Sequence, residues 1–241
     1  MGAAPRDDMA YAEDAPPPSL LTIFWAALAL ARHWWSPRPW RVSIEERHDR
    51  KGFPPLLYTA AARREGGDAC FVDGSARNGR CGFGAFYGDG HRLNRSAAVD
   101  VTSPFGANNV AELAAIFSTV LRHPRAAPLR VFTDSALSLR ALGRARNDPD
   151  AHLPLPPPGP ALARATVALL ELRAAETTLA KVAGHGDVPG NEIADALAAA
   201  GAARRADVLA LPAAFYGGGR ATLSTLRLQV AYLARESNPP D

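Results

Sequence analysis

Residues 178–203 constrain the fold of this chain more than any other stretch; they read TLAKVAGHGDVPGNEIADALAAAGAA. A short apolar run ends at Val182, a loop rich in Gly and Pro holds His185, and an Ala/Leu-rich helix carries Asp195 in its first turns. A strand, a loop with an ionisable imidazole and a helix with an inward carboxylate form half of a site for metal-dependent chemistry. The other half requires further carboxylates at strand ends or on a facing helix.

Two more apolar runs end in aspartates. Residues 69–72 lead into Asp73-Gly74-Ser75, and residues 129–132 lead through Thr133 into Asp134. Because ligands gather at the carboxyl ends of strands in α/β sheets, we expect both carboxylates in one site. Glu112 lies on the flank of the apolar face of a helix predicted over residues 108–123.

The order of the predicted elements favours an α/β domain with a mixed sheet. After the first strand, two segments around the turn Gly88-Asp89-Gly90 predict an antiparallel meander. Further strands then alternate with helices. The expected segments are strands at 82–87, 92–101, 129–132 and 178–182, and helices at 108–123, 136–146 and 161–175.

Composition divides the chain into four segments. Residues 1–19 have the acidic, Pro-rich composition of a disordered tail, and residues 20–66 form an extension rich in apolar residues, Trp, Arg and Pro. A boundary near Gly67 opens a catalytic domain over residues 67–205. Residues 206–241 are expected to form a C-terminal tail with a short helix.

The N-terminal extension begins with a twelve-residue apolar run, LLTIFWAALALA. This run is shorter than the roughly 20 residues that span a bilayer, and the acidic segment before it is unlike a signal peptide. We therefore expect no membrane span and an intracellular protein, cytoplasmic or nuclear. The segment from Leu20 to Trp40 is expected to pack on the protein itself or on a protein partner. Its Trp and Arg residues fit a linker held against the core, or a platform that stacks on bases.

The whole-chain charge of +3 is compatible with an acidic partner such as nucleic acid, but it is a small excess. The two cysteines, Cys70 and Cys81, lack the spacing of a zinc site and are too few for a disulfide framework. A reducing compartment fits this usage.

Five motifs in order give the chain its family resemblance. Asp73 in DGS, Glu112 in NNVAEL, Asp134 in FTDS, His185 in GHGDVPGNE and Asp195 in EIAD follow one another along the predicted strands and helices. From Ala69 to about Arg204 the chain resembles type 1 ribonuclease H. The resemblance implies an α/β ribonuclease H-like fold, in which helices flank a mixed five-stranded sheet of a three-stranded antiparallel meander and two parallel strands.

The resemblance also implies an activity, the endonucleolytic hydrolysis of the RNA strand of RNA/DNA hybrids by a two-metal mechanism. Asp73, Glu112, Asp134 and Asp195 would bind two Mg²⁺ ions, for which Mn²⁺ can substitute, and hard cations do prefer carboxylate oxygens. His185 would assist proton transfer and product release. The side chains of Asn78, Asn108 and Asn109 match positions that contact the two strands of the hybrid.

Two departures from the family pattern concern the DNA strand. Phe105 and Ala107 stand where the family commonly has a basic residue and a threonine that hold a DNA phosphate. That strand should therefore bind more weakly or through another region. The flanking segments look like those of ribonuclease H domains from non-LTR retrotransposons; a detached fragment of such an element, a viral enzyme and a cellular ribonuclease H all remain compatible with the sequence.

A second function from another class is a catalytically silent module that binds RNA/DNA hybrids while docked to a polymerase or other partner. The four acids argue against it, because a pure binding domain has no physical use for clustered carboxylates that face a polyanion.

Overall fold

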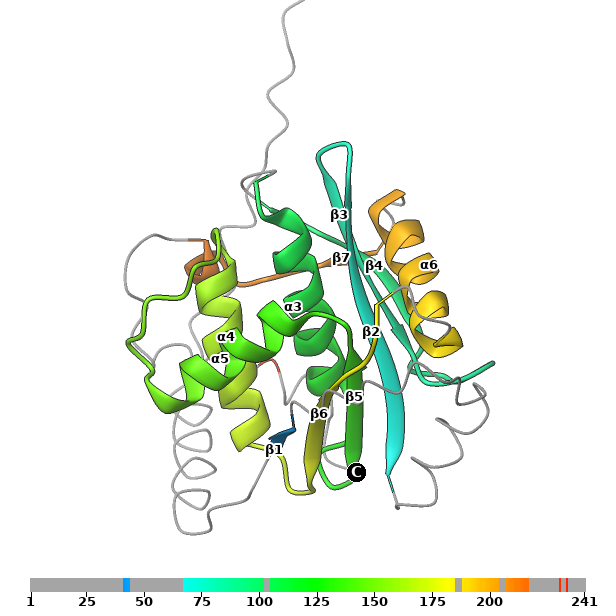
Figure 1. The fold of residues 1–241 in the computed structure, drawn as a ribbon, viewed down its shortest axis with the longest axis horizontal. Helices are drawn as coiled ribbons and strands as arrows, with labels where there is room; N and C mark the ends of the chain where they lie inside the picture. The colour runs from blue at the N-terminus through cyan, green and yellow to red at the C-terminus, as the bar shows by residue number, and fades with distance from the viewer. Residues whose placement is uncertain are drawn as a thin grey trace, which may run out of the picture.

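The computed structural model describes residues 41–43, 67–101, 105–184, 188–203 and 207–216, together with positions 230 and 233. The expectations for residues 1–40 and for His185 lie outside the described residues. The described elements form a single seven-stranded sheet with helices on both faces (Figure 1). None of the described helices is long and apolar enough to cross a membrane.

The five predicted strands form the centre of the sheet. Strand β2 (Asp68–Arg77) pairs antiparallel with β3 (Arg80–Phe86), which pairs antiparallel with β4 (Arg95–Val99). On its other side β2 runs parallel to β5 (Leu129–Thr133), which runs parallel to β6 (Thr177–Lys181). This arrangement confirms the ribonuclease H-like fold, with its meander and two parallel strands.

Two short strands extend the sheet beyond the predicted five. Strand β1 (Arg41–Ser43) pairs parallel with β6, and β7 (Val208–Leu209) pairs parallel with β4. The sheet order is therefore β1-β6-β5-β2-β3-β4-β7. Both outer strands come from segments that flank the predicted catalytic domain, so these segments continue the same sheet.

Three helices pack together on one face of the sheet: α3 (Ala107–Arg122), α4 (Ala136–Asn147) and α5 (Gly159–Glu171) (Figure 1). The main core cluster lies between them and the sheet, with Val72, Phe83 and Leu113 fully buried. Helix α6 (Pro189–Ala203) covers the other face over β2, β3 and β4. A short 3-10 helix, η1 (Ala213–Phe215), follows β7.

Strand β2 is longer than the sequence prediction. The apolar run that predicts this strand ends at residue 72, but β2 continues through Asp73-Gly74-Ser75 to Arg77 in unbroken register with β3. The turn comes at Asn78 and Gly79, whose φ angles of 52° and 72° are both in the left-handed region. An Asn-Gly pair favours a two-residue hairpin there. A glycine inside a strand, such as Gly74, instead marks a place where another backbone approaches closely.

Candidate functional site

The first acidic side chain comes from the middle of β2. Asp73 is buried, and its Oδ1 accepts a 2.7 Å hydrogen bond from the backbone N–H of Gly74. Gly74 lies against the backbone of α3, where a built Cβ atom would stand only 2.2 Å from the amide nitrogen of Glu112. The missing side chain at Gly74 therefore lets β2 and α3 approach closely enough to bring Asp73 beside Glu112.

Glu112 lies in α3 and is only 5% exposed. Its Oε2 atom is buried and has no hydrogen-bond partner among the described residues. A buried polar atom without a partner is costly, and native proteins rarely keep one without a functional reason. This carboxylate oxygen therefore points to a ligand of the site.

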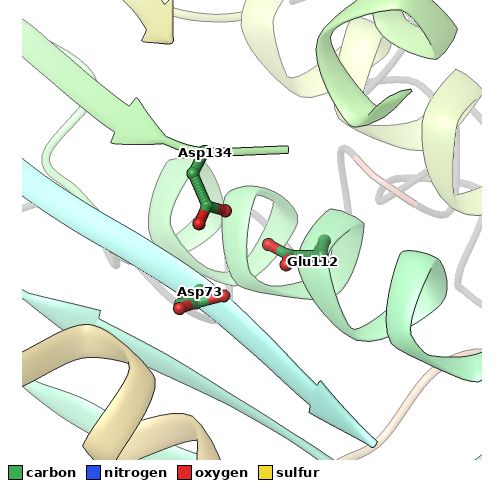
Figure 2. Close-up of side chains that lie close together, drawn as sticks. All are labelled: Asp73, Glu112 and Asp134. Atoms are coloured by element: carbon green, nitrogen blue, oxygen red, sulfur yellow. The ribbon is translucent and has the colours of Figure 1, made fainter. Parts of the chain in front are cut away.

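Asp134 follows β5 directly and lies in the short connection to α4. The backbone N–H of Ser135 donates to Thr133 Oγ1 at 3.1 Å, and Ser135 Oγ accepts from the N–H of Ser138 as the N-cap of α4. These bonds fix the strand-to-helix turn that carries Asp134. Figure 2 shows the three acidic side chains converging from β2, α3 and the end of β5. One carboxylate oxygen from each lies within 4.8 Å of the others.

Burial raises the pKa values of two of the three carboxyl groups. Loss of water raises the pKa of Glu112 most, and the negative charges of Asp73 and Asp134 raise it further. Desolvation also raises the pKa of Asp73; the charges of Asp134 and Asp195 add to it, while its hydrogen bond with Glu112 opposes the rise. Without a cation the cluster thus favours a bound proton, which is the electrostatic signature of a site built for positive charge.

Asp195, the fourth predicted acid, lies half-buried on α6, outside the group of three. Its negative charge nevertheless contributes to the raised pKa of Asp73, so it acts electrostatically on the cluster. Gly184, which precedes His185 in the sequence, lies against Asp134: a built Cβ atom would be 2.7 Å from Asp134 Oδ2. The chain that leads to His185 thus passes directly beside the acidic cluster.

Asn191 is a site residue that the sequence analysis missed. It is 3% exposed, its Nδ2 donates to Asp134 Oδ2 at 3.4 Å, and its Oδ1 has no hydrogen-bond partner among the described residues. It precedes Asp195 by four positions, which places both on one face of α6. That spacing was the signal available in the sequence.

The three asparagines lie toward one end of the molecule. Asn78 is exposed at the tip of the β2–β3 hairpin, and Asn108 and Asn109 are exposed and half-buried in the first turn of α3. Helix α3 runs antiparallel to β2, because Thr119 Oγ1 lies 3.9 Å from Cys70 Sγ while Glu112 lies against Gly74. The first turn of α3 and the hairpin tip are therefore at the same end of the sheet.

The donor set fits a hard divalent cation. The three convergent carboxylates supply oxygen ligands, and one oxygen of Glu112, Oε2, is buried without a hydrogen-bond partner among the described residues. The amide of Asn191, whose Nδ2 donates to Asp134, carries a second such buried oxygen, Oδ1. Mg²⁺ and similar ions prefer such oxygen ligands and would offset the mutual repulsion of the acids.

The comparison with protein families agrees with this geometry. The RNase H family model matches residues 67–203, more than half of the chain. A solved structure described as the foamy viral protease-reverse transcriptase in complex with dsDNA is similar at 18% identity and a TM-score of 0.45, covering 57% of this chain and 95% of that chain. No curated protein matches. The family match spans the acidic cluster and every strand from β2 to β6, and the chain belongs to the RNase H family.

Proposed function

We propose that this protein is a metal-dependent endonuclease that hydrolyses the RNA strand of RNA/DNA hybrids and leaves a 3′-hydroxyl and a 5′-phosphate. The observation that carries the proposal is the convergence of Asp73, Glu112 and Asp134 within 4.8 Å, in a chain of the RNase H family. Four acids that face a polyanionic substrate would repel it without cations. The silent binding module gives no reason for this arrangement.

In this proposal Asp73, Glu112, Asp134 and Asp195 hold two Mg²⁺ ions. When bound, the ions supply positive charge to the attacking and leaving oxygens of a phosphodiester. Asp73 is the central ligand, because it lies between α3 and α6 and is influenced by all three other acids. The amide of Asn191 holds the Asp134 carboxylate in place through the bond to its Oδ2.

His185 is proposed to move a proton during the reaction and to help release the product, without binding metal. Its place in the sequence directly after Gly184 supports this role, because Gly184 lies against Asp134. Asn78, Asn108 and Asn109 are proposed to contact the two strands of the hybrid, since amide groups can both donate to and accept from 2′-hydroxyl groups.

A cleavage assay tests the proposal. Labelled RNA/DNA, RNA/RNA and DNA/DNA duplexes are incubated with the full chain and Mg²⁺, and cleavage of only the RNA in the hybrid is expected. Asp134→Asn removes a charged ligand and keeps the shape of the side chain, so its cleavage rate should fall by at least about a hundredfold. Retained cleavage by the Asp134→Asn protein would contradict the metal site.

The folding of the same variant supplies its control. Removing one of several mutually repelling carboxylates should leave the thermal midpoint in EDTA unchanged or higher. A lower midpoint would mean that the lost activity reflects unfolding. In that case Asp134 would be structural.

A further inference from the structure

The tip of the β2–β3 hairpin carries two arginines directly opposite each other. Arg77 and Arg80 form the last pair of the ladder, next to the turn at Asn78 and Gly79. Positive φ at both central residues is the mark of a type I′ turn, which fixes the hairpin rigidly. All four residues are exposed, and Figure 1 shows the hairpin reaching past the helices on either side of it.

This pairing is unfavourable in the protein alone. Side chains directly opposite each other on an antiparallel ladder have Cβ atoms about 5 Å apart, so two like charges there repel. Within the described parts of the chain, no acidic side chain pairs with either arginine. The hairpin tip therefore holds two positive charges that an anion would stabilise.

The hairpin connects this charge to the acidic cluster. Because side chains alternate along a strand and the register is unbroken, Arg77 and its partner Arg80 share the face of the sheet that Asp73 occupies. Arg77 lies four residue steps along β2 from Asp73, a distance of about 13 Å. The first turn of α3, with Asn108 and Asn109, lies at the same end of the sheet.

A duplex that runs along β2 from the acidic cluster would bring a phosphate within range of this tip. Nucleic acid advances about 3.4 Å per base pair, so about 13 Å corresponds to about four base pairs. The five residues Phe105 to Asn109 at the start of α3 contain no charged side chain. The hairpin tip therefore supplies positive charge at this end of the sheet, on the face opposite to α3.

We propose that Arg77 and Arg80 together bind one backbone phosphate of the hybrid, about four base pairs from the cleaved bond, and so position the duplex over the acidic cluster. This inference rests on the proposed function and adds a site to it. The planar guanidinium group of arginine matches a phosphate with two parallel hydrogen bonds. Such a contact fixes the register of the duplex and reads no base sequence.

The same arginines could instead stabilise the end of helix α6. A Cβ atom built on Gly82 would lie 2.1 Å from the backbone nitrogen of Ala202, so the last turn of α6 lies beside the start of β3. The free carbonyl groups of a helix C-terminus attract cations. In that structural role the arginines would contribute to folding but not to hybrid affinity.

The test measures binding and folding in the same variants of the full chain. Arg77→Gln, Arg80→Gln and the double variant are titrated against a fluorescent RNA/DNA hybrid in EDTA, where hydrolysis does not occur, over a series of KCl concentrations. The double variant should bind the hybrid about tenfold more weakly at low salt. The slope of its log Kd plotted against log salt concentration should be smaller than that of the wild type by about 0.9, the value for one phosphate contact. With Mg²⁺, KM should rise and kcat should stay within about twofold.

Arg92→Gln is the matched control. Arg92 is another exposed arginine, in the turn at the opposite end of β3, so its loss removes the same charge away from the hairpin tip. This variant should keep the wild-type affinity and salt slope. Equal losses in Arg92→Gln and in the single variants Arg77→Gln and Arg80→Gln would show a general charge effect and would overturn the site.

Two other outcomes also overturn the proposal: an unchanged salt slope in the double variant, and a lower thermal midpoint with unchanged affinity, which would assign the arginines to α6. A wild-type protein that binds the hybrid without cutting it with Mg²⁺ would refute the proposed activity, while the salt slopes would still decide the role of the hairpin.

Discussion

His123 is a titratable residue buried away from the acidic cluster, at the end of α3. Its side chain is fully buried, and neither ring nitrogen has a hydrogen-bond partner among the described residues. The Tyr87 ring stacks on it at 5.9 Å, and Arg173 donates to its backbone oxygen at 3.2 Å. Desolvation, and then the charge of Arg173, lower the pKa of His123 to about 4; the partly exposed Asp68 opposes this only in part.

The burial of His123 predicts that this one residue destabilises the fold as pH falls. The folded protein binds a proton at His123 only near pH 4, whereas the unfolded chain binds it near pH 6.5. Between these values the unfolded state holds more protons at position 123, so His123 should lower the free energy of unfolding by about 2–3 kcal/mol as pH falls from about 6.5 to 4. The raised pKa values of Glu112 and Asp73 act in the opposite direction over this range, so the contribution of His123 is the difference between the wild type and a variant without it, measured by urea unfolding at pH 7 and pH 4.5.

The variant His123→Gln isolates the contribution of this one histidine. It removes the titrating group, so lowering the pH from 7 to 4.5 should favour the folded state of this variant by about 2–3 kcal/mol relative to its effect on the wild type. His152→Gln, which removes an exposed histidine, is the control. Equal pH dependence in His123→Gln and the wild type would show that His123 does not destabilise the fold as pH falls.

At the residue scale the sequence identified the acidic residues, but it did not identify Asn191, which donates a hydrogen bond to one of them. Asp73, Glu112 and Asp134 were predictable because each stands in a short motif at a definite place on a strand or helix. Asn191 was missed because a buried amide is recognised by its neighbours, and its neighbour Asp134 is 57 positions away. The roles assigned to His185, Asp195 and the three asparagines stay predictions.

At the scale of elements, α6 packs on the sheet through backbone contacts. A Cβ atom built on Gly84 would lie 2.1 Å from the carbonyl oxygen of Ala194 and 2.8 Å from the nitrogen of Ala198. Glycine at this position of β3 therefore allows the helix to lie directly on the strand. Ala194 precedes Asp195, so this contact also sets the position of that carboxylate.

We expect Gly84→Ala to destabilise the protein and to slow cleavage. The new methyl group meets backbone atoms, which cannot rotate away, so α6 has to shift and Asp195 shifts with it. The free energy of unfolding should fall by about 3 kcal/mol or more, as measured by urea unfolding. An unchanged unfolding curve would contradict the close packing of α6 on β3.

Gly143→Ala is the matched control in α4, because no heavy atom lies within 4 Å of a Cβ built there. Alanine favours a helix over glycine by about 1 kcal/mol, so this variant should be slightly more stable than the wild type.

The length of the elements limited what the sequence could predict. The helices α3 and α4 begin and end within one residue of the expected bounds, because long apolar periodicity defines them. Strands β1 and β7 have three and two residues, too few for any periodicity, and they exist through their pairing with β6 and β4.

At the scale of the whole molecule, the C-terminal segment completes the core. Beyond residue 203, where the family match ends, β7 pairs with β4 and the Arg95 guanidinium group forms a 2.9 Å salt bridge with Asp207. Phe215 is 2% exposed and packs edge-on against Phe117, and Val230 is fully buried in the main core cluster. We therefore propose that the folding unit extends past the expected boundary at residue 205. That the segment from Leu20 to Trp40 covers this unit or a partner stays a prediction.

A truncation tests this boundary. A chain that ends at Ala203 lacks β7, Phe215 and Val230, and burying each of these two side chains stabilises a fold by about 1.5–3 kcal/mol. Their combined loss of about 3–6 kcal/mol is a large part of the stability of a typical domain, about 5–15 kcal/mol. The bare edge of β4 would also be open to pairing with other chains. The shortened protein should therefore melt at a lower temperature or aggregate, whereas a chain that ends at residue 233 keeps all these contacts and should melt like the full chain. Equal thermal midpoints for the chains ending at 203 and 233 would show that the segment is dispensable, and that the family match alone defines the folding unit.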